Sequence, residues 1–411
     1  MRNLVILIFI PVIITACRPS TTNQFPETVS VEVINPLSES RKDVEVFIPF
    51  PDASTIGAFT VRSNEVLLPA QKDSISLLVV LDSLKANEKR IITVYYNTSG
   101  VNENYNRKRT QAELSHRFGG EWKDREYIGG KFRNVDHLRV PPEHKDHSWF
   151  LRYEGPGWES EKVGYRFYLD QRNAIDVFGK KTPDMVLMGV GQDGFDSYHN
   201  MQSWGMDIMK VGKSLGLGSI GVWSDTTAIR IEKTDSVECD VHDGDLSSWI
   251  RTCYYGWKTP HDTVDVTSSL AIYAGTRLTY HAIEASKNLA SLCTGIVKDK
   301  EGKVFKSMGG NSSWGYMATF GKQSLNNDNL GLVVLFPPES FVAFHEDAFS
   351  NVVEFKMIED GEGFFSTAEY FFGAAWELEP HGITNETDFI KWVEKSAREL
   401  ANPVIVNVNV K

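Results

Sequence analysis

Val29-Ser-Val-Glu-Val-Ile34 opens a stretch, residues 28–100, in which apolar and polar side chains alternate. The pattern returns in Val44-Glu-Val-Phe-Ile48, Ser76-Leu-Leu-Val-Val-Leu81 and Arg90-Ile-Ile-Thr-Val-Tyr-Tyr96, with turn residues between the runs. A period of two is typical of strands that are buried on one face. Short alternating strands at this spacing predict an antiparallel β-sandwich over residues 28–100.

Working outward, the β-rich pattern continues through residues 101–411, in runs such as Thr227-Ala-Ile-Arg-Ile231 and Leu332-Val-Val-Leu-Phe336. Strands this numerous usually form two packed sheets. We therefore predict an all-β chain in which a large antiparallel two-sheet domain, supersandwich-like and poor in helices, follows the small sandwich. We expect the strand at residues 404–408 to close this large domain.

Two segments have helical spacing. Residues 204–215 are one candidate, which would place Asp207 and Lys210 one turn apart. The better one begins at Asn385 or Thr387, either of which can cap a helix with apolar residues on one face.

The first residues, MRNLVILIFIPVIITAC, combine a positive charge, an apolar run and small residues directly before Cys17. This order predicts a lipoprotein signal peptide over residues 1–16, with Cys17 as the lipidation site. Residues 17–27 are polar and predict a tether. Since the apolar run is shorter than the roughly 18–20 residues of a membrane-spanning helix, we expect a cell-envelope lipoprotein, in the periplasm or on the outer membrane, held by its lipid alone.

The formal net charge of −11 makes nucleic-acid binding improbable. Cys239, Cys253 and Cys293 follow Cys17 without a Cys-x-x-Cys pair, which argues against a thiolate zinc site. An acidic protein that binds an acidic ligand has to concentrate positive charge locally, and we expect this between residues 152 and 213.

Residues 146–213 carry charged and aromatic side chains at a density that a purely structural strand does not need. Arginine pairs with carboxylate or sulfate in a bidentate manner, and a tryptophan beside glycine can stack on a sugar ring. Strand-face ion pairs and aromatic core packing are the structural alternatives. This composition favours an acidic oligosaccharide as partner, with substrate-binding residues at Arg152, Trp158, Glu159, Lys162, Arg166, Arg172, Trp204, Asp207 and Lys210.

Proton-transferring groups accompany these residues. The candidate catalytic residues are His147, His199, Tyr198 and Tyr165, with His199 the first choice as base. A divalent metal at His144, Asp146 and His147 is the alternative, because imidazole and carboxylate at this spacing can share an ion. We expect a reaction that needs neither metal nor cofactor.

Leu151-Arg-Tyr-Glu-Gly-Pro-Gly-Trp-Glu-Ser160, Val163-Gly-Tyr-Arg-Phe-Tyr-Leu-Asp170, residues 172–180 and residues 198–213 resemble a bacterial domain-of-unknown-function family. Its members are secreted proteins from polysaccharide-utilisation loci, and those acting on ulvan are described as oligosaccharide dehydratases. The resemblance implies a lyase that removes water from an unsaturated uronyl residue.

In such a lyase, His147 or His199 would take a proton, Tyr198 or Tyr165 would protonate the leaving hydroxyl, and Arg166 with Lys162 would hold the carboxylate. Trp158 would stack on the neighbouring sugar. A β-eliminating polysaccharide lyase would use the same groups, and a non-catalytic glycan-binding lipoprotein would use only the stacking and charged residues.

Overall fold

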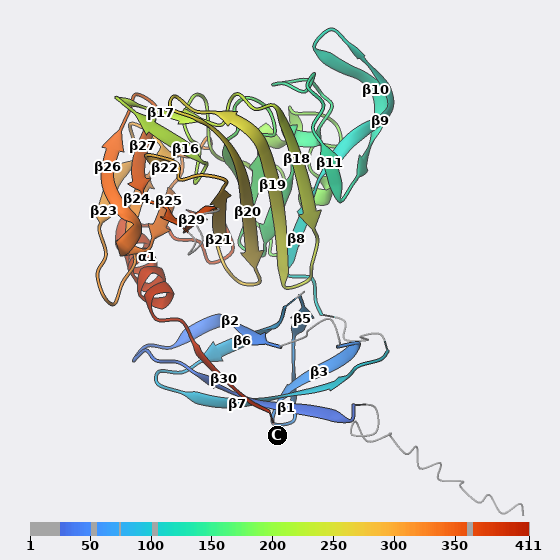
Figure 1. Ribbon diagram of the computed structural model, residues 1–411, viewed down its shortest axis with the longest axis vertical. Helices are drawn as coiled ribbons and strands as arrows, with labels where there is room; N and C mark the ends of the chain where they lie inside the picture. The colour runs from blue at the N-terminus through green and yellow to red at the C-terminus, as the bar shows by residue number, and fades with distance from the viewer. Residues whose placement is uncertain (1–24, 51–55, 74, 101–105, 360–364, 411) are drawn as a thin grey trace, which may run out of the picture.

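The chain folds into an all-β molecule, as predicted, in which a small sandwich lies beside a larger, strongly curved body (Figure 1). The computed structural model describes residues 25–50, 56–73, 75–100, 106–359 and 365–410. The predicted signal peptide, Cys17 and most of the tether lie outside these ranges. Within them, no helix is both long enough and apolar enough to cross a membrane.

The small sandwich packs a five-stranded sheet, in the order β30-β1-β7-β3-β4, on a three-stranded sheet, β2-β6-β5. Every second residue of β1 is buried, so that Val29, Val31 and Val33 join the core that the two sheets share. The strands are β1 (Glu27–Ile34), β2 (Arg41–Pro49), β3 (Ala58–Ser63), β4 (Val66–Leu68), β5 (Ala70–Lys72), β6 (Ser76–Leu84), β7 (Lys89–Asn97) and β30 (Ile405–Val410).

The last strand, β30, corrects one expectation. Instead of closing the large domain, it pairs antiparallel with β1, with Val31 opposite Val408 and Val33 opposite Val406. These valines pack on the core of the small sandwich, and the pairing covers an edge of β1 that would otherwise be open. Both ends of the described chain therefore belong to one sheet.

The large body is built on a ten-stranded antiparallel sheet. In order, its strands are β11 (His137–Arg139), β18 (Ser236–His242), β19 (Ser247–Lys258), β20 (Thr263–Tyr273), β21 (Leu278–Ala285), β29 (Ser366–Trp376), β25 (Leu330–Phe336), β24 (Gly315–Gly321) and β23 (Lys303–Ser307), and β28 (Ile358–Glu359) pairs with β29.

Two five-stranded sheets share one core with the main sheet. The first is β15 (Gly205–Asp207), β14 (Ile175–Lys180), β13 (Val163–Phe167), β12 (Gly157–Ser160) and β8 (Thr110–Glu113). The second is β17 (Thr227–Arg230), β16 (Gly221–Ser224), β22 (Leu292–Val297), β27 (Ser350–Phe355) and β26 (Phe341–Glu346).

Short elements complete the body. A hairpin of β9 (Ser115–Lys123) and β10 (Glu126–Asn134) projects from it (Figure 1). The 3-10 turns are η3 (Arg152–Glu154), η4 (Leu187–Gly189), η5 (Ser197–His199) and η6 (Pro338–Ser340).

Among the described residues there is one α-helix, α1 (Glu386–Ala401). The side chain of Asn385 caps it by accepting a hydrogen bond from the Asp388 amide at 3.0 Å. Phe389, Val393 and Ala397 are buried in a core shared with β24 and β25. The other helical candidate, residues 204–215, is wrong: its first residues form β15, which pairs with β14.

Strands β13 and β14 are buried along their whole length because both faces of their sheet are covered. Val163, Tyr165 and Phe167 point into the main core, whereas Phe178 joins a second apolar cluster with Tyr198. The alternate residues of β13, which include Arg166, lie on the opposite face of the sheet. The segments around η3 and η5 cover that face.

Candidate active site

A buried arginine organises the second face of this sheet. Arg166 on β13 is directly opposite Asp176 on β14 and donates from Nε and Nη2 to Asp176 Oδ2, at 3.1 and 2.7 Å. Nη2 also donates to Asp207 Oδ2 at 2.6 Å, and Nη1 donates to the Tyr198 hydroxyl oxygen at 2.9 Å. The guanidinium is 3% exposed, so it is an internal counter-ion.

The two aspartates compete for this single positive charge. Burial, and then the charge of Asp207, raise the pKa of Asp176 to about 6. Tyr168 donates its hydroxyl to Asp176 Oδ2 at 2.5 Å, which completes the set of groups around that oxygen. The positive charge of Arg166 therefore holds the two aspartates in place, and these carboxyl groups outnumber the one guanidinium between them.

A second arginine continues the network towards solvent. Arg172 Nη1 lies 2.9 Å from Asp146 Oδ1 and Nη2 lies 2.7 Å from Glu154 Oε1, while Asp170 binds the guanidinium from the other side. Burial alone would raise the pKa of Glu154, but the charges of Arg166 and Arg172 outweigh it and lower the pKa to about 2.

Two exposed histidines border the network, and each one has a carboxylate behind it. Nε2 of His199 lies 3.3 Å from Oδ2 of Asp207, and the side chain is 45% exposed. The hydrogen bond to Asp207 raises the pKa of His199. Nδ1 of His147 lies 2.5 Å from Oδ1 of Asp146, and this side chain is 65% exposed.

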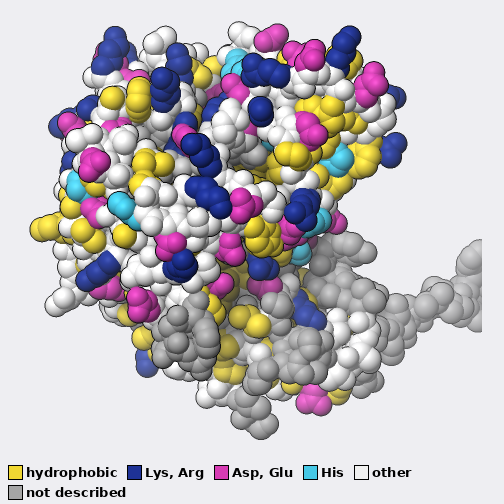
Figure 2. Space-filling view, turned by 45° about the horizontal axis from the view of Figure 1, so that its top comes forward, with side chains coloured by type: hydrophobic (Ala, Val, Ile, Leu, Met, Phe, Trp, Pro, Cys, Tyr) yellow, Lys and Arg dark blue, Asp and Glu magenta, His cyan; other side chains and the backbone are white. Residues whose placement is uncertain are grey.

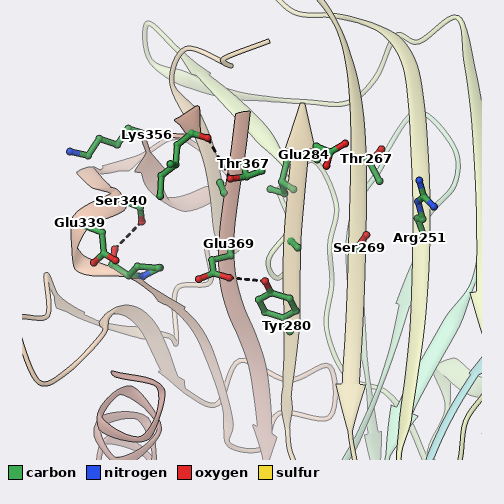
Figure 3. A pocket seen from close by; sticks show the side chains of 15 residues that line it. Arg251, Thr267, Ser269, Tyr280, Glu284, Glu339, Ser340, Lys356, Thr367 and Glu369 are labelled. Carbon is green, nitrogen blue, oxygen red and sulfur yellow. Dashed lines mark hydrogen bonds between the residues drawn. The ribbon is translucent and has the colours of Figure 1, made fainter. Parts of the chain in front are cut away.

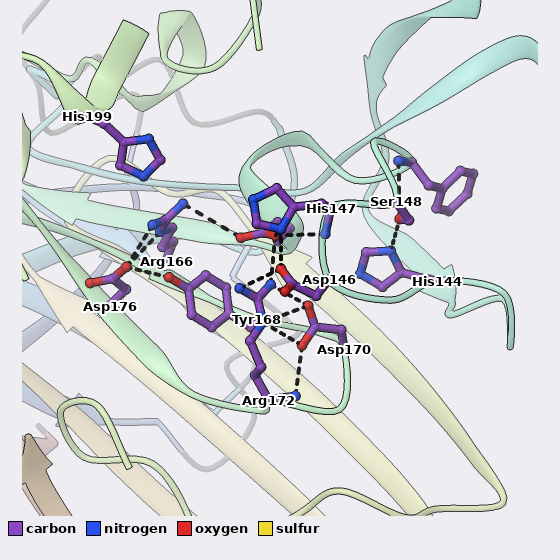
Figure 4. Close-up of polar contacts among 12 residues, drawn as sticks. His144, Asp146, His147, Ser148, Arg166, Tyr168, Asp170, Arg172, Asp176 and His199 are labelled. Carbon is purple, nitrogen blue, oxygen red and sulfur yellow. Dashed lines mark hydrogen bonds and ion pairs between the residues drawn. The ribbon is translucent and has the colours of Figure 1, made fainter. Parts of the chain in front are cut away.

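Aromatic rings connect the two imidazoles through a cluster in which Phe195 and Tyr198 are buried. The ring of His147 lies 5.4 Å from that of Phe195, Phe195 lies 6.4 Å from Tyr198, and Tyr198 lies 4.6 Å from His199. Trp149, half-buried, packs against Phe195 at 4.2 Å. The two histidines thus border the same aromatic cluster, and Figure 4 shows both imidazoles beside the network of Arg166.

The backbone before the site is unusual. Four non-glycine residues within eight positions have positive φ: His147 at 57°, Trp149 at 61°, Tyr153 at 35° and Glu154 at 75°. Such conformations cost free energy and gather at functional sites, where the surrounding contacts impose them. Here the ion pairs of Glu154 and Arg172 hold the segment in place.

The residues considered as an alternative metal site lie in a cluster of ion pairs. Asp146, His147 and Glu154 bring three ligand atoms within 4.8 Å of one another, but His144 is not part of this set. Nδ1 of His144 instead lies 2.7 Å from the Ser148 hydroxyl. The guanidinium of Arg172 already contacts both carboxylates, so the three residues fit a bound cation poorly.

Two predicted site residues belong to the main core. Trp158 is 1% exposed, donates from Nε1 to Thr279 at 2.9 Å and stacks on Tyr165. Tyr165 donates its hydroxyl to the Arg277 carbonyl oxygen at 2.6 Å. The expectations of sugar stacking by Trp158 and proton transfer by Tyr165 are therefore wrong, because β12 and β13 turn these rings towards the main sheet.

Arg152 and Glu159 are also structural. Arg152 is fully buried, pairs with Glu113 and donates to the carbonyl oxygens of residues 187, 188 and 190. Glu159 accepts from the amides of residues 186 and 187 at 2.7 Å each and pairs with Lys180 at 2.5 Å. The positive charge expected between residues 152 and 213 is thus largely neutralised inside the protein.

The other predicted residues are dispersed. Trp204 is half-buried, with its ring 5.9 Å from Phe178, and Lys210 is exposed beyond the end of β15. Lys162 lines a cavity of about 560 Å³ between the small sandwich, α1 and the large body. Of the predicted set, the structure gathers His147, His199, Tyr198, Arg166, Arg172 and Asp207.

Asp176 and Trp149 belong to the candidate site although the sequence did not predict them as site residues. Asp176 lies between Ile175 and Val177, and the signal was its position: a carboxylate inside an apolar strand needs a buried partner. That this partner is Arg166 depends on the register of β13 and β14, which the sequence does not reveal. Trp149 has no local sequence signal beyond its place beside His147.

A second hollow, of about 570 Å³, lies on the outward face of the main sheet. Figure 3 shows Tyr280 and Glu369 facing each other on neighbouring strands there, with a hydrogen bond of 2.6 Å from the tyrosine to the carboxylate. No residue predicted for the site lines this groove. In Figure 2, basic and acidic side chains are interspersed over the face that is turned to the viewer.

Comparison with known proteins gives a family and two distant structures. The family model described as "Domain of unknown function (DUF4861)" matches residues 33–406, and no curated protein matches. A glycosyl hydrolase family 38 protein from Enterococcus faecalis is similar at 9% identity and a TM-score of 0.44, covering 93% of this chain and 47% of its own. An alpha-mannosidase from Enterococcus faecalis V583 gives 8% and 0.43, covering 93% and 46%. The chain spans about half the length of these two proteins.

Proposed function

The chain belongs to the DUF4861 family, whose function is unknown, and from its site geometry we propose that it is a carbohydrate-active lyase. The proposed reaction removes water from an unsaturated uronyl residue of an ulvan-type oligosaccharide. The observation that carries the proposal is the pair of exposed imidazoles, His147 and His199, each with a carboxylate at its ring nitrogen.

This pair suits an elimination because the reaction needs one base and one acid. His199 takes the proton from a ring carbon, and the C–H electrons form the new double bond as the C–O bond breaks. His147, in its protonated form, gives its proton to the leaving hydroxyl, which departs as water. The proton on His199 then returns to solvent, and His147 takes up a proton from solvent, so both groups regain their starting forms.

Each histidine is oriented by its own carboxylate. Asp207 orients the His199 ring and stabilises the imidazolium that forms, while Asp146 does the same for His147. Arg166 fixes Asp207 and Tyr198 and acts as a positioning residue. Tyr198 is buried, and burial raises its pKa. We therefore assign it a structural role beside Arg166 and not the role of proton donor.

Recognition of the substrate carboxylate has to differ from the sequence prediction. Nε and Nη2 of Arg166 are committed to Asp176 and Asp207, so this guanidinium is not an open clamp. We propose Lys210 for this contact on its sequence position and exposure alone, since it follows Asp207 by three residues. Trp149 offers the half-buried ring on which a neighbouring sugar can stack.

The test compares intact polysaccharide with oligosaccharides made from it by a lyase. Purified protein is incubated with each, and the product masses are read. Oligosaccharides that lose one water without shortening support the proposal. Shortening of the polymer would make the protein a polysaccharide lyase, and unchanged masses with measurable binding would make it a glycan-binding protein; either result overturns the proposal.

A further inference from the structure

A cavity far from the histidines has the chemistry of a binding site. It measures about 560 Å³, within the range of small-molecule sites. Its walls come from β2 of the small sandwich, the turn before β21, the outward face of α1 and the segment leading to β30. In Figure 1 this junction lies between the sandwich and the body, beside α1.

Cations outnumber carboxylates in the cavity wall, five to three, although Arg277 pairs with Glu379 behind the wall. Lys42 and Lys162 line it, and neither forms an ion pair within the described residues. Arg41, which is 8% exposed, bonds only neutral oxygens: Asn35 Oδ1 at 3.0 Å and the carbonyls of Glu399 and Asn402. Lys395 adds a fourth cation, 3.8 Å from the carboxylate of Glu399.

Two of the carboxyl groups in the cavity wall contribute little free negative charge. Asp43 pairs with Arg109 at 2.6 Å, outside the lining. Burial raises the pKa of Glu45 to about 7, so this carboxyl is partly neutral at physiological pH. The wall is thus locally positive in a chain whose formal net charge is −11.

Aromatic rings form the remaining walls. Trp392 and Phe371 line the cavity and are half-buried, and Arg277 lies over the Trp392 ring at 5.6 Å. Half-buried rings beside cations offer a stacking face and an anion contact to the same ligand. A small inorganic anion would leave both rings unused.

We propose that this cavity binds a sugar ring carrying a carboxylate or sulfate, with Lys42 and Lys162 at the anion and Trp392 on the ring face. The site joins the small sandwich to the large body, so a bound saccharide contacts both. The inference goes beyond the proposed reaction, because it needs no chemistry at His147 or His199.

The test is calorimetric titration of the full chain with three probes: digalacturonate, N-acetylglucosamine 6-sulfate and neutral cellobiose. We expect at least one anionic probe to bind more tightly than cellobiose, with affinity falling as salt rises. Lys42→Ala combined with Lys162→Met should weaken that binding about tenfold or more. Trp392→Leu should weaken it as well.

Lys391→Ala is the matched control, since Lys391 belongs to the same helix but is exposed and pairs with Asp388. It should bind like the wild type, and thermal melting checks that each variant is folded. Equal affinity for cellobiose, no binding of either anionic probe, or wild-type affinity in the folded double variant would overturn the proposal. Because binding is measured without turnover, a failure of the proposed lyase reaction leaves this result unaffected.

Discussion

Arg166 shows how far a residue's surroundings decide its role. In the sequence it has the features of a ligand-binding arginine, yet in the fold it holds Asp176 and Asp207 together. Its loss leaves two buried carboxylates without their counter-ion. The same side chain that looks like a substrate clamp is therefore first a stability element.

Replacement of Arg166 by Ala should destabilise the protein by about 3–5 kcal/mol, measured by urea unfolding. Arg139→Ala is the control, because Arg139 is largely exposed and its loss should change stability by less than about 0.5 kcal/mol. Adding Asp176→Asn to Arg166→Ala should restore part of the loss, since one uncompensated charge is removed. Equal stability of wild type and Arg166→Ala would show that the ion pairs contribute nothing.

Replacement of either proposed catalytic histidine tests the acid–base pair directly. His199→Ala and His147→Ala should each lower kcat by about 10²–10⁴ with little change in KM. His137→Ala is a close control, because His137 is an exposed histidine 2.8 Å from Asp240, away from the network. If both alanine variants keep full activity, the histidines have no part in the reaction.

The pH profile tests the role of Asp207. The hydrogen bond to Asp207 holds the pKa of His199 above its ordinary value of 6.5. A base works in its neutral form, so kcat/KM should fall as pH drops through this raised pKa. Asp207→Asn should move the acid limb to lower pH while lowering the maximum. The pH at which kcat/KM falls does not depend on the amount of folded enzyme. If this pH is the same in Asp207→Asn as in the wild type, Asp207 does not control the pKa of His199.

At the scale of elements, alternation predicts strands and says little about which face a residue takes. The run Val163-Gly-Tyr-Arg-Phe167 is a strand, as expected, but both of its faces are covered, so Tyr165 and Arg166 enter different buried clusters. Trp158 was assigned to a sugar because a tryptophan beside glycine has the same local sequence on a surface and in a core. The sequence indicates that residues 146–213 belong to a functional site. It does not reveal the strand register that pairs Arg166 with Asp176.

Strand β30 is expected to protect the small sandwich. A chain ending after Val404 loses the strand that covers the edge of β1, and with it Val406 and Val408 from the core of the sandwich. We expect the small sandwich to be cut by protease at concentrations that leave the full chain intact. Removing only Lys411 is the control. Equal resistance of both truncations would show that β1 does not depend on its partner.

At the scale of the whole molecule, the arginines expected to bind the ligand, Arg152, Arg166 and Arg172, are paired with carboxylates, whereas Lys42 and Lys162 line the junction of sandwich and body without an ion pair among the described residues. The predicted lipid anchor concerns the whole chain and rests on the sequence alone. If Cys17 carries the lipid, Cys17→Ser should release the protein from the membrane fraction while its melting temperature stays the same, because Cys17 precedes the first strand, β1, by ten residues. Recovery of the variant with the membrane would contradict lipidation at Cys17.

The pairing of β30 with β1 also sets the order in which the molecule can be completed. Val29 is made early in synthesis and its partner Val410 is made 381 residues later. During synthesis, the edge of β1 therefore stays unpaired until almost the entire sequence has emerged. Contacts this distant in sequence form slowly. A chain cut short before Ile405 leaves this edge of β1 unpaired, so only copies that include β30 can cover it.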